Sequence, residues 1–150
     1  GTALSEGIGE KLTALPPIPQ CQVLIAKPAV SVSTKTVYES LDAMELREED
    51  HPDIDRMIEA IRQRDIRQVA GLFKNVLELV TAGKYPVIGQ IEEEMKKRGA
   101  VNAIMSGSGP TVFGLFINPM AAKAAYDALR FGEASGLAKQ VYLTNFYNNL

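Results

Sequence analysis

The sequence has no tryptophan, one cysteine and one histidine in 150 residues. Cys21 therefore has no partner for an internal disulfide, and its place before the apolar residues 23–26 predicts a buried strand position rather than a nucleophile. His51 lies among acidic residues without a second histidine or a cysteine nearby, which favours a solvated loop over a zinc site. We expect neither a disulfide scaffold nor a metal site in this chain.

The sequence also lacks an excess of charge of either sign and any long hydrophobic run. Its 16 Lys and Arg residues against 18 Asp and Glu residues leave a net charge of −2 at pH 7, which offers no electrostatic footprint for nucleic acid. No apolar run approaches the roughly 20 residues of a membrane span, and the N-terminus lacks the layout of a signal peptide. We expect a soluble, cytoplasmic protein without nucleic-acid or membrane partners, built around one core.

Hydrophobic periodicity, helix caps and turn residues predict a series of short elements. The N-terminal residues 1–9 suit a strand and a turn, and the prolines within residues 15–19 make a rigid connector. The predicted strands cover residues 22–27, 103–105, 111–117 and 140–146. The predicted helices cover residues 34–44, 54–61, 66–82 and 86–98, with a last helix that begins at Asn118 and Pro119.

In this order the elements predict an α+β fold of the ferredoxin-like, split βαβ type. Such a fold has a four-stranded antiparallel sheet with helices on one face, and here it carries extra helices in the first crossover. Residues 111–117 are apolar on both sides of the strand, so this strand should be central in the sheet. The fold hosts many unrelated functions and does not identify one.

Charged residues on the 86–98 helix have helical spacing. Glu92 and Glu93 precede Lys96 and Lys97 by four residues, which is the order that complements the helix dipole. We expect a solvated helix face here, without a binding role.

The most informative motif is the tight turn Ser106-Gly107-Ser108-Gly109-Pro110, which joins two predicted strands. A glycine-rich turn presents backbone N–H groups with few side chains in the way, so it suits an anion such as a phosphate or a diphosphate. A plain strand connection uses the same residue types and stays open as an alternative. The surrounding pattern excludes a P-loop, a Rossmann fingerprint and the nucleophile elbow of serine hydrolases.

A second candidate surface is the beginning of the 34–44 helix. Ser33 and Thr34 lie where free backbone N–H groups favour a polar or anionic ligand. Tyr38 lies beside the apolar stripe of this helix, so its ring suits stacking on a planar group. The alternative for Tyr38 is a ring that covers the edge of the core with its hydroxyl in water.

Residues 105–113 resemble the third, C-terminal motif of the GHMP small-molecule kinases. Residues 27–38, together with residues 1–12 and 75–78, narrow the resemblance to members that act on a cytidylyl diphosphate substrate in the non-mevalonate route to isoprenoids. The resemblance implies a two-lobed enzyme that moves the γ-phosphoryl group of ATP, with Mg²⁺, to a hydroxyl of this substrate.

The family's N-terminal lobe carries a Pro-x-x-x-Gly-Leu-Gly-x-x-x-Ser phosphate loop and the Lys and Asp of the chemistry, and none of these motifs occurs in this sequence. By resemblance, residues 1–19 are a strand, turn and connector from the preceding lobe, and residues 20–150 are the GHMP-kinase-like C-terminal domain. We expect no catalytic residue in this chain, no ATP or Mg²⁺ bound to it alone, and no activity without its N-terminal lobe.

The resemblance also assigns the two candidate surfaces. It implies that Ser106, Gly107, Ser108 and Gly109 line the cleft between the lobes, near the phosphoryl acceptor. It also implies that Tyr38 stacks on the cytosine ring of the substrate, with Thr34 and Ser33 near the same pocket. Two alternatives remain from the residues alone: a ferredoxin-like regulatory module that senses a small anion at residues 106–109, and a scaffold domain whose glycine turn is only a turn.

Overall fold

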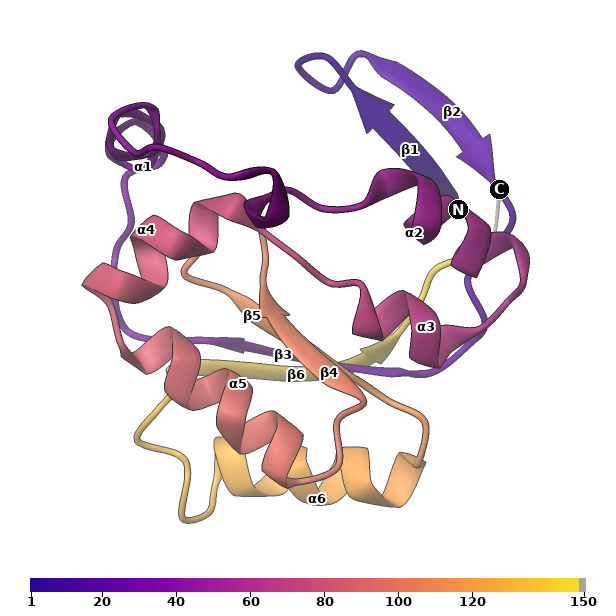
Figure 1. Cartoon of the computed structure of the whole chain (residues 1–150). Coiled ribbons are helices and arrows are strands. Elements are labelled where there is room, and N and C mark those ends of the chain that lie inside the picture. The colour runs from indigo at the N-terminus through magenta and orange to yellow at the C-terminus, as the bar shows by residue number, and fades with distance from the viewer. Residues whose placement is uncertain (149–150) are drawn as a thin grey trace.

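The computed structural model describes residues 1–148 and contains one four-stranded antiparallel sheet (Figure 1). Its strand order is β4-β5-β3-β6, so the apolar strand β5 lies inside the sheet as predicted. The ferredoxin-like α+β prediction is confirmed. The strands are β3 Gln22–Lys27, β4 Asn102–Met105, β5 Val112–Phe116 and β6 Gln140–Asn145.

One face of this sheet carries the main core. The register aligns Met105, Val112, Ala26 and Val141 across the four strands, and all four side chains are buried. Helices α5 (Val87–Lys97) and α6 (Pro119–Arg130) cover this face (Figure 1). Burial of this row and of the helix residues packed on it fixes the register, because a slip by one residue would turn the row to the other face.

The helices of the first crossover begin at capping side chains. Helix α1 (Thr34–Asp42) has Ser33 as its N-cap, and helix α2 (Ile54–Arg62) has Asp53. Each cap accepts a hydrogen bond from a backbone N–H in the first turn, which otherwise lacks a partner. A short 3₁₀ helix at Glu48–Asp50 lies between them.

The prediction of one continuous helix over residues 66–82 is wrong. Residues 66–84 form two helices, α3 (Ile66–Gly71) and α4 (Val76–Lys84), because Asn75 begins a new helix with its side chain as N-cap. Gly83 lies inside α4 and does not end it. The break lets the two helices pack in different places. Helix α3 packs through Ala70 on the second face of the sheet, against Val23 and Leu115, whereas α4 lies beside the edge strand β4.

Strands β1 (Thr2–Glu6) and β2 (Lys11–Leu15) form a separate hairpin that projects away from the main sheet (Figure 1). Leu15 is its anchor, in an apolar cluster with Ile61 of α2. The N-terminus of the chain lies close to the described C-terminal end, where the Gly1 amino group donates to the Tyr147 carbonyl over 3.1 Å. No helix within residues 1–148 is long and apolar enough to cross a membrane.

Candidate functional site

The glycine turn between β4 and β5 is a compact loop with two residues in the left-handed region. Gly107 has φ +57° and Gly109 has φ +84°, and the Gly109–Pro110 peptide is cis. The loop is closed by two backbone hydrogen bonds, from Ser106 N to Thr111 O (2.8 Å) and from Gly109 N to Ser106 O (3.0 Å). Glycine is needed at both positions because other residues rarely adopt this backbone conformation.

Close packing adds a second requirement at Gly109. A Cβ atom built there would lie 2.5 Å from Met105 Sδ and 3.2 Å from Thr81 Cγ2. No atom lies within 4 Å of the corresponding position at Gly107, which is exposed. Gly109 therefore fits against the core, and Gly107 faces open space.

Two backbone N–H groups of the loop remain available. No acceptor within residues 1–148 receives the N–H of Gly107 or of Ser108. Gly107 is exposed and Ser108 is partly exposed, so the two donor residues lie at the surface. Free and preoriented N–H groups in a left-handed turn are suited to hold phosphate oxygens.

The loop carbonyls, in contrast, are bonded to helix α4. Asn75 Nδ2 donates to Met105 O (2.9 Å) and to Gly107 O (2.8 Å). Thr81 Oγ1 donates its one hydrogen to Ser108 O (3.0 Å), with Leu77 O of the preceding turn as a second, slightly more distant acceptor (3.2 Å). Asn75 and Thr81 therefore fix the backbone of the loop without using its side chains.

The start of α1 meets the same loop. Thr34 Oγ1 and Ser108 Oγ lie 2.8 Å apart and share a hydrogen bond, although the two residues are 74 positions apart in the sequence. The structure thus brings together one residue from each of the two surfaces that the sequence singles out. Ser33 lies next to this contact, but its hydroxyl caps α1 by accepting from Thr36 N over 3.3 Å.

Tyr38 lies one turn after Thr34, so both side chains leave the same side of α1. Tyr38 is 50% exposed, whereas the neighbouring Val37 is buried in the core between α1 and α4. No hydrogen bond within residues 1–148 joins the Tyr38 hydroxyl to another group. The ring is accessible for stacking, and the role of Tyr38 stays a prediction.

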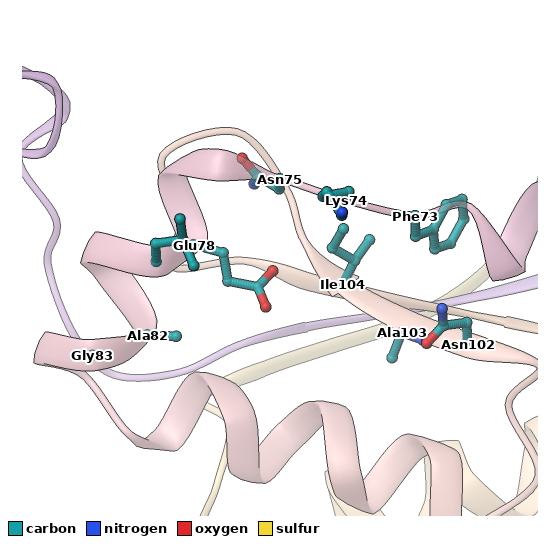
Figure 2. A pocket seen from close by; sticks show the side chains of 10 residues that line it. Phe73, Lys74, Asn75, Glu78, Ala82, Gly83, Asn102, Ala103 and Ile104 are labelled. Carbon is teal, nitrogen blue, oxygen red and sulfur yellow. The ribbon is translucent and has the colours of Figure 1, made fainter. Parts of the chain in front are cut away.

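Beside the loop, α4 and the edge strand β4 enclose an open cleft of about 450 Å³ (Figure 2). The Glu78 carboxylate extends from α4 into this cleft, and Asn75 lies near its upper end. Glu78 Oε2 accepts the N–H of Met105 over 3.1 Å. This N–H is on the outer edge of β4, so Glu78 covers a group that an edge strand leaves unpaired.

Behind Glu78 lies a second carboxyl group, that of Glu92 on α5. Glu92 is 9% exposed, and its Oε1 has no hydrogen-bond partner within residues 1–148. Burial, followed by the neighbouring Glu78 carboxylate, raises the pKa of Glu92 to about 7. The prediction of a solvated face is therefore wrong for Glu92, because this position turns inward, toward α4. Glu93 is exposed and pairs with Lys96.

The described residues contain neither a metal-binding cluster nor an activated thiol. Within residues 1–148, no group of three or more His, Cys, Asp and Glu side chains is arranged to hold a metal ion. Cys21 is buried, as predicted, and burial raises the pKa of its thiol to about 11. A thiol with such a pKa is protonated at neutral pH and is a poor nucleophile.

Sequence reasoning did not assign a role to Asn75, Glu78, Thr81 or Glu92. Residues 75–78 entered only as part of a family likeness, and the missed helix break hid the capping position of Asn75. A signal was present, because Asn is a favoured N-cap residue.

Comparison with known proteins identifies the family of this chain. Residues 57–134 match the family described as GHMP kinases C terminal, and the chain belongs to the GHMP kinase family. The chain is 54% identical to 4-diphosphocytidyl-2-C-methyl-D-erythritol kinase of Lachnospira eligens over 147 residues, which is 98% of this chain and 49% of that protein. It is 52% identical to the enzyme of the same name from Lachnoclostridium phytofermentans, covering 99% of this chain and 50% of that protein.

Solved structures show the same relationship. A crystal structure of 4-(cytidine 5'-diphospho)-2C-methyl-D-erythritol kinase superposes with a TM-score of 0.70 at 26% identity, over 95% of this chain and 48% of that one. Homoserine kinase from Cytophaga hutchinsonii gives a TM-score of 0.74 at 19% identity, over 95% and 47%, which shows a shared fold. The chain spans about half the length of the relatives it matches and corresponds to their C-terminal half.

Proposed function

We propose that this chain is the C-terminal, substrate-binding lobe of an ATP-dependent kinase that phosphorylates a hydroxyl of 4-diphosphocytidyl-2-C-methyl-D-erythritol, in non-mevalonate isoprenoid biosynthesis. The names of the relatives support the substrate. The observation that carries the proposal is the hydrogen bond between Thr34 and Ser108, because it joins the helix start beside Tyr38 to the glycine loop. One continuous surface would then present the ring of Tyr38 for stacking and the backbone N–H groups of Gly107 and Ser108 for a phosphate.

In this proposal the glycine loop acts on developing negative charge. The substrate hydroxyl attacks the γ-phosphorus of ATP, the bond to the bridging oxygen of ADP breaks, and the hydroxyl proton passes to a base. The N–H groups of Gly107 and Ser108 would stabilise the charge that grows on the phosphoryl oxygens, which is the largest kind of contribution in such reactions. Ser106 and Gly109 complete the loop, and we assign its phosphate-binding role to residues 106–109.

Tyr38 would stack on the cytosine ring, with Thr34 and Ser33 on the same wall of the pocket. Stacking on an aromatic side chain is worth about 1–3 kcal/mol per base. Because the ring contacts a part of the substrate that does not react, its binding energy should be equal in the ground state and the transition state.

The phosphate loop and the base of the reaction would lie on an N-terminal lobe. Mg²⁺ neutralises charge on the ATP phosphates in enzymes of this kind. The described residues of this chain form no cluster for such an ion, so we assign none of them to it. We also assign no catalytic base to this chain.

The test is an ATP-consumption assay coupled to detection of the phosphorylated cytidylyl product. We expect turnover from the complete two-lobed protein and none from the purified 150-residue chain. Turnover by this chain alone would contradict the proposal, as would an upstream coding sequence without a Gly-Leu-Gly-x-x-x-Ser loop. Binding of pyrophosphate to the chain, with no effect of cytidine diphosphate, would instead favour a small-anion sensor.

A further inference from the structure

Three side chains at the start and on one side of α4 form hydrogen bonds with main-chain atoms at the end of β4 and in the glycine loop. Asn75, the N-cap of α4, and Glu78 and Thr81 within α4 are spaced three residues apart, and each bonds the end of β4 or the loop. Asn75 bonds two carbonyls, Thr81 bonds a third, and Glu78 accepts one N–H. These residues of α4 and its N-cap therefore hold the loop through main-chain atoms, in addition to the side-chain contact of Ser108 with Thr34.

The contact from Asn75 to Gly107 O also sets the direction of a donor. In a trans peptide unit the C=O and the N–H point in opposite directions. The Gly107–Ser108 peptide is trans, and its C=O is directed at Asn75 Nδ2 over 2.8 Å. The N–H of the same peptide unit, which belongs to Ser108, must then point away from α4. This N–H is one of the two loop donors without an acceptor within residues 1–148.

We propose that Asn75 and Thr81 are positioning residues that hold the Ser108 amide in the direction needed to bind a phosphoryl oxygen. The inference rests on the proposed function, because it takes residues 106–109 as the phosphate loop. Asn75 fixes the peptide that contains this N–H, and Thr81 fixes the next peptide through Ser108 O. Neither side chain needs to touch the substrate.

The Asn75 side chain has two roles that a substitution separates. Its Oδ1 caps α4 by accepting Leu77 N over 3.1 Å, and its Nδ2 bonds the loop. Asn75→Asp keeps an oxygen for the cap and removes both donors, so α4 should still begin at the same residue. Asn118→Asp is the matched control, because Asn118 caps α6 through Oδ1 in the same way and makes no contact with the loop.

The experiment uses the two-lobed kinase and measures kcat, KM for the cytidylyl substrate, and the backbone ¹⁵N heteronuclear NOE of Gly107 and Ser108. For Asn75→Asp we expect kcat to fall about 10-fold to 100-fold, less than or equal to the loss of a direct oxyanion donor. KM should change by less than about threefold, because uniform binding is untouched. The NOE of the loop should drop, and Asn118→Asp should match wild type in all three measurements.

Thr81 gives a second, independent pair of variants. Thr81 is buried, so Thr81→Val keeps its shape and removes the hydroxyl, whereas Thr81→Ser keeps the hydroxyl. We expect a lower kcat and a looser loop for Thr81→Val, and near wild-type values for Thr81→Ser. An equal loss in both would indicate a packing role and overturn the assignment of Thr81.

The outcomes separate the inference from the proposed function. A loop that stays as rigid as wild type in Asn75→Asp, with unchanged kcat, overturns the positioning role alone. A loosened loop with unchanged kcat shows that residues 106–109 take no part in the reaction and overturns both. An inactive wild-type enzyme overturns the proposed function, while the NOE still decides whether Asn75 holds the loop.

Discussion

The chain contains two Gly-x-Gly turns, and they differ in almost everything except their backbone. Gly7 and Gly9 lie at the tip of the β1–β2 hairpin, and Gly107 and Gly109 lie between β4 and β5; all four have positive φ. In each turn the N–H of the second glycine donates to the carbonyl three residues earlier, from Gly9 to Glu6 (3.1 Å) and from Gly109 to Ser106 (3.0 Å).

The surroundings of the two turns are opposite. At the hairpin tip Ile8 is 99% exposed, and its N–H is bonded by Glu10 of the same turn. The loop at residues 106–110 is bonded by α4 through Asn75 and Thr81 and by α1 through Thr34. A glycine pair therefore encodes the shape of a turn, and the elements packed around the turn decide whether it has fixed, usable donors.

The largest difference between the turns should appear on adding a side chain to the second glycine. Gly109→Val places a Cβ against Met105 and Thr81 at a strained φ, so we expect kcat of the two-lobed enzyme to fall by about 100-fold or more. Gly9→Val meets only Ser5 Oγ, at 3.7 Å, and should cost about 1–2 kcal/mol of backbone strain without changing kcat. Steady-state kinetics and thermal unfolding of both variants check this.

A Gly109→Val enzyme that folds and keeps normal kcat would make the two turns equivalent. It would reduce residues 106–110 to a strand connection. A loss of kcat in Gly9→Val would show instead that the hairpin tip also contributes to the reaction.

A second comparison uses one glutamate near each turn, Glu92 and Glu10, and the pH dependence of the unfolding free energy. The raised pKa of Glu92 means that the folded chain binds this proton more tightly than the unfolded chain, so stability is full below about pH 4.5 and is lost as pH rises through about 7. Glu92→Gln stays neutral, and we expect it to gain about 2 kcal/mol in unfolding free energy over wild type at pH 8 and little at pH 4.5.

Glu10→Gln is the matched control at the hairpin, where the carboxylate is exposed. Urea unfolding of both variants at pH 4.5 and pH 8 gives the difference directly. An equal pH dependence of wild type and Glu92→Gln would mean that Glu92 has the same pKa in the folded and the unfolded chain.

The smallest expected effect is on substrate binding, from removal of the Tyr38 ring beside the glycine loop. We expect Tyr38→Ala to raise KM for the cytidylyl substrate about tenfold, about 1.4 kcal/mol of lost stacking, with little change in kcat. Tyr142→Ala is a suitable control, because Tyr142 on β6 is 54% exposed against 50% for Tyr38. Identical kinetics for both variants would show that Tyr38 does not bind the substrate, and would leave no assigned stacking site for the cytosine ring beside the loop.

Local rules were sufficient for most of the fold. Val112 and Phe116 alternate with apolar neighbours and lie in a central strand, and Ser33 and Asn118 cap the helices that their residue types predict. These features depend on the nearest residues in the sequence, so periodicity and capping preferences identify them.

The candidate site was less accessible to such rules. The sequence singled out Thr34 and Ser108 separately, but their contact joins residues far apart in the chain and follows only from the fold. The same holds for Glu92, which has the spacing of a solvated helix face and is buried because α4 lies against α5. Asn75 was hidden because apolar residues on both sides of the break continue one helical stripe.

The bonds from α4 to main-chain atoms have a consequence for how this site can change over evolution or in the laboratory. Asn75 and Thr81 recognise carbonyl groups, which every amino acid possesses, so they place few demands on the side chain at position 106. Ser106 is exposed and forms no side-chain hydrogen bond within residues 1–148. If the proposed function holds, we expect new side chains at this position to alter which acceptor is preferred, while the backbone of the loop stays unchanged.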